Sequence, residues 1–381
     1  MATPVRTPRP VPAGIEPAVP QMHQSPESAR SMRACVIRGI GELDQVEIAE
    51  LPAPRSGRNL GAREVRVAVH AAALNHLDLF VVRGLPVDYT FPHVLGSDGA
   101  GVVDGVGAEV TAVRPGEPVL INPGVSCYAC EFCRAGEHAL CVNYQVLGEH
   151  RPGTMAEYVV VPEANVARLP RLDPPLTWPE AAAFSLATLT AWRMVVTRAK
   201  VRPGEWVLVW GIGGGVALMA MRIAKLRGAW VIVTSSSDAK LAEAKKLGAD
   251  VTLNHRTQKV AQEVRALTDK RGVDVVVENV GDATWEESLR ALAKGGRLVT
   301  CGATTGPKVV TDVRRLFWNQ YTIMGSTMGN EAEYRETVRL LGEGHLRPHV
   351  DRVYPLAEAR TALERLQQSE QLGKVVVRVK D

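Results

Sequence analysis

Residues 207–227 read VLVWGIGGGVALMAMRIAKLR, and this stretch decides the fold class of the chain. The apolar run before the glycines is typical of a buried strand, and the run after them has the composition of a helix. At such a turn the bare backbone can approach a pyrophosphate, and the free N–H groups at the helix start favour an anion. The strand–turn–helix context predicts a dinucleotide-binding turn, not merely a flexible glycine-rich loop. The residues predicted to contact the cofactor here are Gly211, Gly213, Gly214, Gly215 and Val216.

The end of the next predicted strand indicates which dinucleotide is bound. Enzymes that bind NAD place Asp or Glu about 20 residues after the glycines, where it holds the ribose 2′-hydroxyl. This chain has Ser235 and Ser236 there, and no acid. Small hydroxyls, together with Lys240 and Arg256, can accept a 2′-phosphate, so the sequence favours NADP(H) over NAD(H). Residues 235–237 also suit the cap of the following helix, and the two interpretations are compatible.

The alternation of strand and helix continues after this turn. Further strands are predicted at 231–234, 273–278 and 297–301, and helices at 238–247 and 285–293. Alternation of this kind predicts a doubly wound parallel sheet, the Rossmann arrangement, for residues 166–324.

The preceding segment, residues 32–165, has a different rhythm. Its short alternating runs are separated by Gly, Pro and Asp, which predicts antiparallel sheets or a small, partly open barrel. After the wound sheet come two predicted helices, 331–341 and 356–368, and a last strand, 374–379. That strand can return to the first sheet, so we expect 325–381 to complete the first domain.

Composition excludes several classes of protein. Apolar residues make up 46% of the 381 residues and charged residues 23%, which is ordinary for a globular enzyme. A net charge of +4 is too weak to indicate binding to nucleic acid or membrane, and no apolar run is long enough for a membrane helix. We therefore expect a cytoplasmic enzyme that acts on a small molecule.

Residues 1–31 stand apart from the rest. They contain seven prolines, no aromatic residue and no periodic pattern of hydrophobic residues. Such a segment cannot bury enough apolar surface to offset the conformational entropy that it would lose on folding. We expect a disordered extension. Met32 is an alternative start, because strand-like sequence begins there.

Four of the six cysteines lie close together, in the pattern Cys127-x-x-Cys130-x-x-Cys133-x₇-Cys141. Four thiolates at this spacing can form a closed tetrahedral zinc site, with no position left for water. Such an ion holds a loop in shape and does no chemistry; a redox-sensing cluster is the alternative. The other two, Cys35 and Cys301, fall in predicted strands, where we expect them to be buried.

These features together resemble the medium-chain dehydrogenase/reductase family. Three further motifs carry the resemblance: 153–158 (GTMAEY), 189–192 (LTAW) and 373–376 (GKVV). The resemblance covers about residues 32–381. It implies a GroES-like barrel as the catalytic domain beside a Rossmann domain, with one structural zinc and a homodimer or homotetramer.

Members of this family that oxidise alcohols hold a second, catalytic zinc through Cys, His and Cys. At the matching positions this chain has Asn75, Ser97 and Leu186. The chain is therefore similar to the zinc-free branch, which includes quinone oxidoreductases and enone or enoyl-thioester reductases. Hydride then passes from NADPH to an activated C=C bond or a quinone, because these acceptors delocalise the charge that a metal would otherwise stabilise.

The resemblance also implies roles for single residues. Asn75 would point its amide toward the substrate or nicotinamide, with a locally satisfied turn residue as the alternative. Tyr89 would donate to the developing oxyanion, although a packing tyrosine suits the sequence equally. His76 would contact the cofactor pyrophosphate. The residues expected to border the nicotinamide are Thr190, Asn279 and Gly302.

Two other functions are compatible with the sequence. One is a zinc alcohol dehydrogenase with a relocated metal, for which the nearby candidate ligands are His76, Asp78, His93, Asp98, Glu149 and His150. The other is a non-catalytic dinucleotide-binding protein, because a fold does not fix a function.

Overall fold

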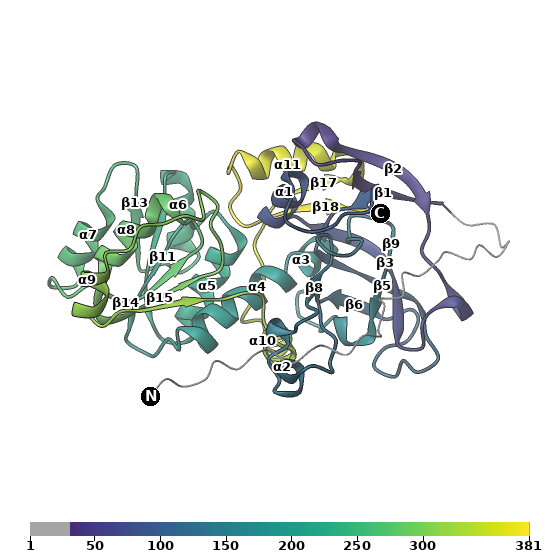
Figure 1. Ribbon diagram of the computed structural model, residues 1–381, viewed down its shortest axis with the longest axis horizontal. Helices are drawn as coiled ribbons and strands as arrows, with labels where there is room; N and C mark the ends of the chain where they lie inside the picture. The colour runs from purple at the N-terminus through teal and green to yellow at the C-terminus, as the bar shows by residue number, and fades with distance from the viewer. Residues whose placement is uncertain (1–30, 381) are drawn as a thin grey trace, which may run out of the picture.

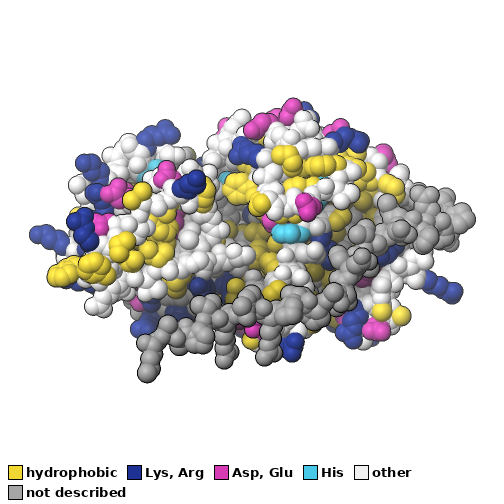
Figure 2. Space-filling model, in the orientation of Figure 1, with side chains coloured by type: hydrophobic (Ala, Val, Ile, Leu, Met, Phe, Trp, Pro, Cys, Tyr) yellow, Lys and Arg dark blue, Asp and Glu magenta, His cyan; other side chains and the backbone are white. Residues whose placement is uncertain are grey.

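The computed structural model describes residues 31–380, so the prediction of a disordered extension lies outside the described residues, except for Ser31, which already belongs to β1. Figure 1 shows an elongated molecule with the parallel sheet at one end and the antiparallel sheets at the other. On the face in Figure 2, basic and acidic side chains are interspersed, as the weak net charge suggests. No helix within 31–380 is both long and apolar enough to cross a membrane.

The first and last parts of the chain build one seven-stranded sheet. Its strand order is β10-β6-β5-β3-β18-β17, with β9 also paired to β3. These strands are β3 (Glu64–Ala73), β5 (Asp98–Val106), β6 (Pro118–Ile121), β9 (Tyr158–Pro162), β10 (Val166–Arg168), β17 (Val350–Pro355) and β18 (Lys374–Arg378). Alternate residues of β3, such as Val65, Val67 and Val69, are fully buried, as period-two sequence requires. The predicted return of the last strand is confirmed, because β18 pairs antiparallel with β3.

Two smaller sheets flank this one. The first has the order β2-β1-β4 and the second pairs β7 with β8. Their bounds are β1 (Ser31–Ile37), β2 (Val46–Pro52), β4 (His93–Val94), β7 (Gly124–Val125) and β8 (Gln145–Val146). The β-rich, antiparallel character predicted for this part of the chain is therefore confirmed.

The central part of the chain forms a six-stranded parallel sheet with the order β13-β12-β11-β14-β15-β16. The strands are β11 (Trp206–Val209), β12 (Trp230–Ser235), β13 (Val251–Asn254), β14 (Val273–Glu278), β15 (Leu292–Thr300) and β16 (Thr322–Gly325). The helices of this part are α5 (Gly215–Leu226), α6 (Asp238–Lys246), α7 (Val260–Leu267), α8 (Asp282–Ala291) and α9 (Val313–Trp318). The predicted doubly wound sheet is confirmed. Chain order reverses between β11 and β14, and ligands bind such sheets in the crevice beyond the strand ends at this point.

The remaining helices cover and join the two sheets. They are α1 (His76–Arg83), α2 (Glu131–Arg134), α3 (Trp178–Ala182), α4 (Ser185–Trp192), α10 (Glu331–Gly342) and α11 (Ala359–Gln367), with a π-helical turn at Arg193–Arg198 and short 3₁₀ turns at Leu43–Gln45, Gly57–Asn59, His138–Leu140, Glu163–Asn165 and Leu356–Glu358. Helix α4 lies between the sheets (Figure 1), and its residues from Ser185 to Ala191 are all buried. One apolar cluster runs from Ala71 and Ala100 of the antiparallel sheet to Val207 of the parallel one. The two halves therefore share a core.

Candidate functional site

A cavity of about 550 Å³ lies between the two sheets, beyond the carboxyl ends of the central parallel strands. Most residues predicted to contact cofactor or substrate line it: Asn75, His76, Thr190, Gly211, Gly213, Gly214, Gly215, Val216, Ser235, Ser236, Lys240, Asn279 and Gly302. Tyr89 and Arg256 do not line this cavity. The fold thus brings together residues that are more than 200 positions apart in the sequence.

The glycine turn has the geometry expected of an anion site. Gly211 has a φ of +68°, and its N–H donates to Thr234 Oγ1 at 3.3 Å, which fixes the turn against β12. A Cβ on Gly213 would lie 2.9 Å from the carbonyl oxygen of Gln371, so this position requires glycine. Gly214 precedes α5 and offers no side-chain cap, so the first N–H groups of the helix remain open to a ligand. The turn therefore fits a pyrophosphate.

At the end of β12 the structure separates the predicted 2′-phosphate contacts. Ser235 and Ser236 line the cavity, while Ser237 caps α6 by accepting the N–H of Lys240 at 3.4 Å. The Lys240 ammonium donates to the carbonyl oxygen of Ser369 at 2.5 Å, and burial lowers its pKa. The exposed Arg256 donates its backbone N–H to Asn254 Oδ1.

Beyond these predicted contacts, the cavity lining includes His255, for which the sequence predicts no role. Its neighbour Arg256, the predicted contact, lies outside the lining.

Three buried polar side chains meet at the other end of the cavity. Asp98 has no exposed surface, and its Oδ2 accepts the side-chain amide of Asn75 at 3.0 Å and the ammonium of Lys374 at 2.9 Å. Lys374 also donates to Asn75 Oδ1 at 2.5 Å. The other oxygen, Asp98 Oδ1, accepts the backbone N–H of Leu186 at 2.7 Å. We call Asn75, Asp98 and Lys374 the buried triad.

The buried triad differs from the sequence prediction in one respect. The amide of Asn75, expected to point at a ligand, is bonded to Asp98, Lys374 and, at 3.4 Å, the carbonyl oxygen of Ala73. The local bond to the backbone of Ala73, which was the alternative predicted for Asn75, is therefore only one of the hydrogen bonds that its side chain makes. Lys374 appears in the sequence only within a terminal motif, and nothing local to that motif indicates where its side chain reaches.

A second buried carboxylate, Asp78, shapes the start of α1. It accepts the backbone N–H groups of Asn75 at 2.7 Å and Gly96 at 3.1 Å. Burial raises the pKa of Asp78 to about 6, although these two bonds favour the charged form. The neighbouring His76 lines the cavity, and burial together with the charge of Lys374 lowers its pKa, so its ring is neutral at pH 7.

Two candidate proton donors lie in different places. Tyr89 packs its ring against Phe91 and His93, with centroids 6.1 and 5.1 Å away. Glu149 lines the cavity instead, and burial raises its pKa above the ordinary value. Its Oε2 lies 3.8 Å from Nδ1 of His150. Glu149 is the one acidic side chain within residues 31–380 that lines this cavity.

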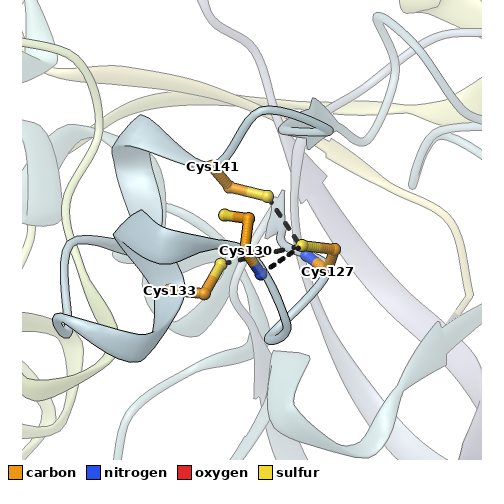
Figure 3. A group of neighbouring side chains, drawn as sticks. All are labelled: Cys127, Cys130, Cys133 and Cys141. Atoms are coloured by element: carbon orange, nitrogen blue, oxygen red, sulfur yellow. Dashed lines mark hydrogen bonds between the residues drawn. The ribbon is translucent and has the colours of Figure 1, made fainter. Parts of the chain in front are cut away.

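The four cysteines converge, as Figure 3 shows. The sulfur atoms of Cys127, Cys130, Cys133 and Cys141 all lie within 4.8 Å of one another. Backbone N–H groups donate to Cys127 Sγ and Cys141 Sγ at 3.3–3.5 Å. Such bonds lower the pKa of Cys127 and bring that of Cys130 to about 6. The donor set and its closed arrangement fit a structural zinc ion.

The remaining two cysteines differ from each other. Cys35 is fully buried in β1, as predicted. Cys301 lies one residue beyond β15 and lines the cavity, so the prediction that it is a strand residue is wrong.

The candidate ligands for a relocated catalytic metal do not assemble. Across residues 31–380, the four cysteines are the only group of three or more His, Cys, Asp or Glu side chains placed to hold an ion. Asp78 and Asp98 are engaged by backbone N–H groups and by the buried triad, and the ring of His93 contacts the carbonyl oxygen of Gly148 at 3.1 Å.

Two family models and several known proteins match this chain. Residues 61–171 match a family model described as the alcohol dehydrogenase GroES-like domain, and residues 215–343 match one described as zinc-binding dehydrogenase. A zinc-type alcohol dehydrogenase-like protein of Schizosaccharomyces pombe is 32% identical over 92% of this chain and 99% of its own length. A crotonyl-CoA carboxylase/reductase of Cereibacter sphaeroides is 30% identical, over 84% of this chain and 81% of that protein. A solved structure described as an NAD-dependent alcohol dehydrogenase has a TM-score of 0.86 and 46% identity, covering 91% of this chain and 99% of its own.

Proposed function

This chain belongs to the medium-chain dehydrogenase/reductase family, and from that premise we propose that it is an NADP(H)-dependent reductase of activated C=C bonds or quinones that uses no catalytic metal. The relatives named above carry the names of oxidoreductases, and two of the three are named alcohol dehydrogenase or alcohol dehydrogenase-like. One is a reductase of an enoyl thioester by name, which is the chemistry proposed here.

The observation that carries the proposal is the buried triad. Alcohol oxidation in this family needs metal ligands, and two of the three matching positions here are Asn75 and Leu186. Both bond to the carboxylate of Asp98, and an ammonium group joins them. A site built from an amide, an apolar side chain and an ion pair is a poor donor set for zinc. Such a site suits hydride acceptors that delocalise the negative charge formed during reduction.

The remaining residues bind and orient the reactants. The open N-terminus of α5 would hold the pyrophosphate, and Ser235 with Lys240 would receive the 2′-phosphate. When bound, NADPH supplies the hydride. Thr190, Asn279 and Gly302 would border the nicotinamide ring, and the apolar side chains of the lining keep water away from it.

Glu149 is the proposed source of the proton that completes the reduction. It is a carboxyl group in the cavity wall, and burial raises its pKa above the ordinary value, so it holds its proton more tightly than usual. Tyr89, predicted to donate to the developing oxyanion, does not line the cavity and has no part in this proposal.

Activity measurements with metal analysis test the proposed function. We expect one zinc per chain and rapid NADPH consumption with quinones, enones or enoyl thioesters, but not with simple ketones. Fast NAD-linked alcohol oxidation with two zinc ions per chain would instead establish the relocated-metal alternative. A chain that binds dinucleotide but turns over none of these substrates would establish the non-catalytic one.

Replacing Ser235 by aspartate is expected to reverse the cofactor preference. A carboxylate at the end of β12 would accept the ribose 2′-hydroxyl and repel a 2′-phosphate, which should shift the ratio of kcat/KM for NADPH over NADH by about 10²-fold. Arg256→Ala is the matched control, because this exposed residue lies outside the cavity. A wild-type protein that already prefers NADH, or a ratio unchanged by Ser235→Asp, would contradict the assignment.

The pH profile of turnover is expected to depend on Glu149. Its pKa is raised, so the acid form persists above the ordinary range of a carboxyl group, and kcat should fall as pH rises through that pKa. Glu149→Gln should lower kcat about 10²-fold and remove this limb of the profile. Glu157→Gln is a control, since Glu157 lies outside the cavity lining and pairs with Arg33. An unchanged profile in Glu149→Gln would assign the proton to another group.

A further inference from the structure

Lys374 places a buried positive charge in the wall of the cavity. It is the first residue of β18, the strand inserted between β3 and β17, and only 4% of it is exposed. A charged side chain at this depth is costly unless it is paired, and Asp98 is its ion-pair partner at 2.9 Å. The chain retains this charge at the substrate end of a cavity whose walls are otherwise largely apolar.

The ammonium group of Lys374 has hydrogen-bonding capacity left over. It carries three N–H donors, of which one goes to Asn75 Oδ1 and one to Asp98 Oδ2. Within residues 31–380, no acceptor takes the third. Asp98, by contrast, is well supplied, because it accepts from Asn75 and Leu186 as well as from the lysine. The donor without an acceptor is therefore the third N–H of the Lys374 ammonium group, and the side chain of Lys374 lines the cavity.

The path of the lysine side chain places it beside both reactants. A Cβ on Gly215 would lie 2.7 Å from Lys374 Cδ, so the stem of the lysine crosses the first turn of α5. Its Nζ lies at Asn75, the position where metal-dependent relatives would have the first zinc ligand. The charge thus lies at the substrate side of the cofactor turn, near the place that the catalytic metal would take.

We propose that Lys374 is a catalytic residue that stabilises the oxyanion formed during reduction, an inference that rests on the proposed function. When hydride bonds to the β-carbon of an enone, the C=C π electrons move onto the carbonyl oxygen, and the nicotinamide is oxidised. The third N–H of Lys374 donates to that oxygen, where the charge develops. A proton added at the α-carbon then restores the carbonyl group, so the acceptor gains one hydride and one proton.

The inference predicts which substrates are accepted. A charged donor fixed in a site that excludes water favours acceptors with an oxygen conjugated to the reacting carbon. Unconjugated alkenes leave the charge on carbon, out of reach of the ammonium. Quinones, enones and enoyl thioesters all place it on oxygen.

The test compares the wild type with a double variant, called the neutral triad, in which both charged side chains of the buried triad are replaced by uncharged ones. Lys374→Met alone would leave Asp98 unpaired, so the informative variant is Lys374→Met combined with Asp98→Asn. With an enone, we expect kcat to fall about 10²- to 10³-fold, and the Kd of NADPH, measured by fluorescence titration, to stay within about threefold. Lys240→Met is the matched control, because it removes a charge from the other end of the cavity and should weaken NADPH binding instead. Lys374→Arg should retain part of the activity.

A second readout does not depend on turnover. At an NADP⁺ concentration that saturates each variant, 4-nitrophenol should bind the wild type as its coloured phenolate, and the neutral triad should lose this ionised form while Lys240→Met keeps it. A weaker NADPH Kd with unchanged kcat and phenolate binding would show that Lys374 serves the cofactor phosphates, which overturns the inference. If the wild type reduces no conjugated acceptor, the proposed function is wrong. If the wild type reduces such acceptors and the neutral triad is equally active, the proposed function stands and only the role of Lys374 is wrong.

Discussion

Asp98→Ala is expected to lower the free energy of unfolding by about 3–5 kcal/mol, because it leaves the Lys374 ammonium buried without its counter-charge. Asp98 has no exposed surface and accepts hydrogen bonds from Asn75, Leu186 and Lys374, so three donors lose their acceptor at once. Urea unfolding followed by tryptophan fluorescence measures the loss.

The neutral triad, Asp98→Asn with Lys374→Met, is the informative companion to this variant. Replacing both members of a buried ion pair is often close to neutral for stability, whereas removing one is not. We therefore expect the double variant to recover most of the stability lost in Asp98→Ala. Arg290→Met serves as a control, because its ion pair with Glu286 is exposed and should contribute less than about 1 kcal/mol. A loss below that level in Asp98→Ala would mean that the charge is solvated.

Removal of the structural zinc ion that we propose for the four-cysteine segment is expected to lower the thermal midpoint by about 5 °C or more. The segment is short and holds few apolar side chains, so a bound metal ion would contribute much of its local stability. Its loss also reaches the interior, because Glu137 bonds the buried Arg193 at 2.5 Å, and Arg193 in turn bonds Glu333 of α10.

Chelation and Cys130→Ser are two routes to the zinc-free protein. Both should reduce the zinc content to zero and expose residues 127–141 to proteolysis, while kcat of the remaining folded protein at low temperature stays unchanged, since four thiolates leave no position for a substrate. Cys35→Ser is the control and should retain its zinc, because Cys35 lies in β1. Immediate loss of kcat on chelation, with the fold intact, would show that a metal takes part in the chemistry.

Much of the fold could be predicted because its signals are local. The glycine turn, the buried parallel strands and the alternating runs of β3 each follow from side chains within a few residues of one another. The sequence did not give bounds for strands β13 and β16 or for helices α7 and α9. Both strands lie at the edges of the parallel sheet and are only partly buried, so they lack the continuous apolar run that marks β11 and β14.

The candidate site was predictable only where one segment of sequence builds it. The turn at 211–216 and the four cysteines are such segments. The buried triad is not, because residues 75, 98 and 374 meet through strand pairing that no local pattern encodes. Arg256 illustrates the converse: it lies close in sequence to the cofactor end of the cavity, but it does not line the cavity, whereas the adjacent His255 does.

The position of β18 within its sheet has a consequence for biosynthesis. Residues 374–378 occupy an interior strand position between β3 and β17, so on a ribosome this sheet lacks one of its inner strands until residue 378 has been translated, later than every other strand of the sheet. The parallel sheet is built from one continuous stretch and can form earlier. Strand β9 can already pair with Glu64–Ala68 of β3, but Ala71–Ala73 lack their partner on that edge until β18 is made, and Lys374, which completes the pocket, follows all the other strands of this sheet.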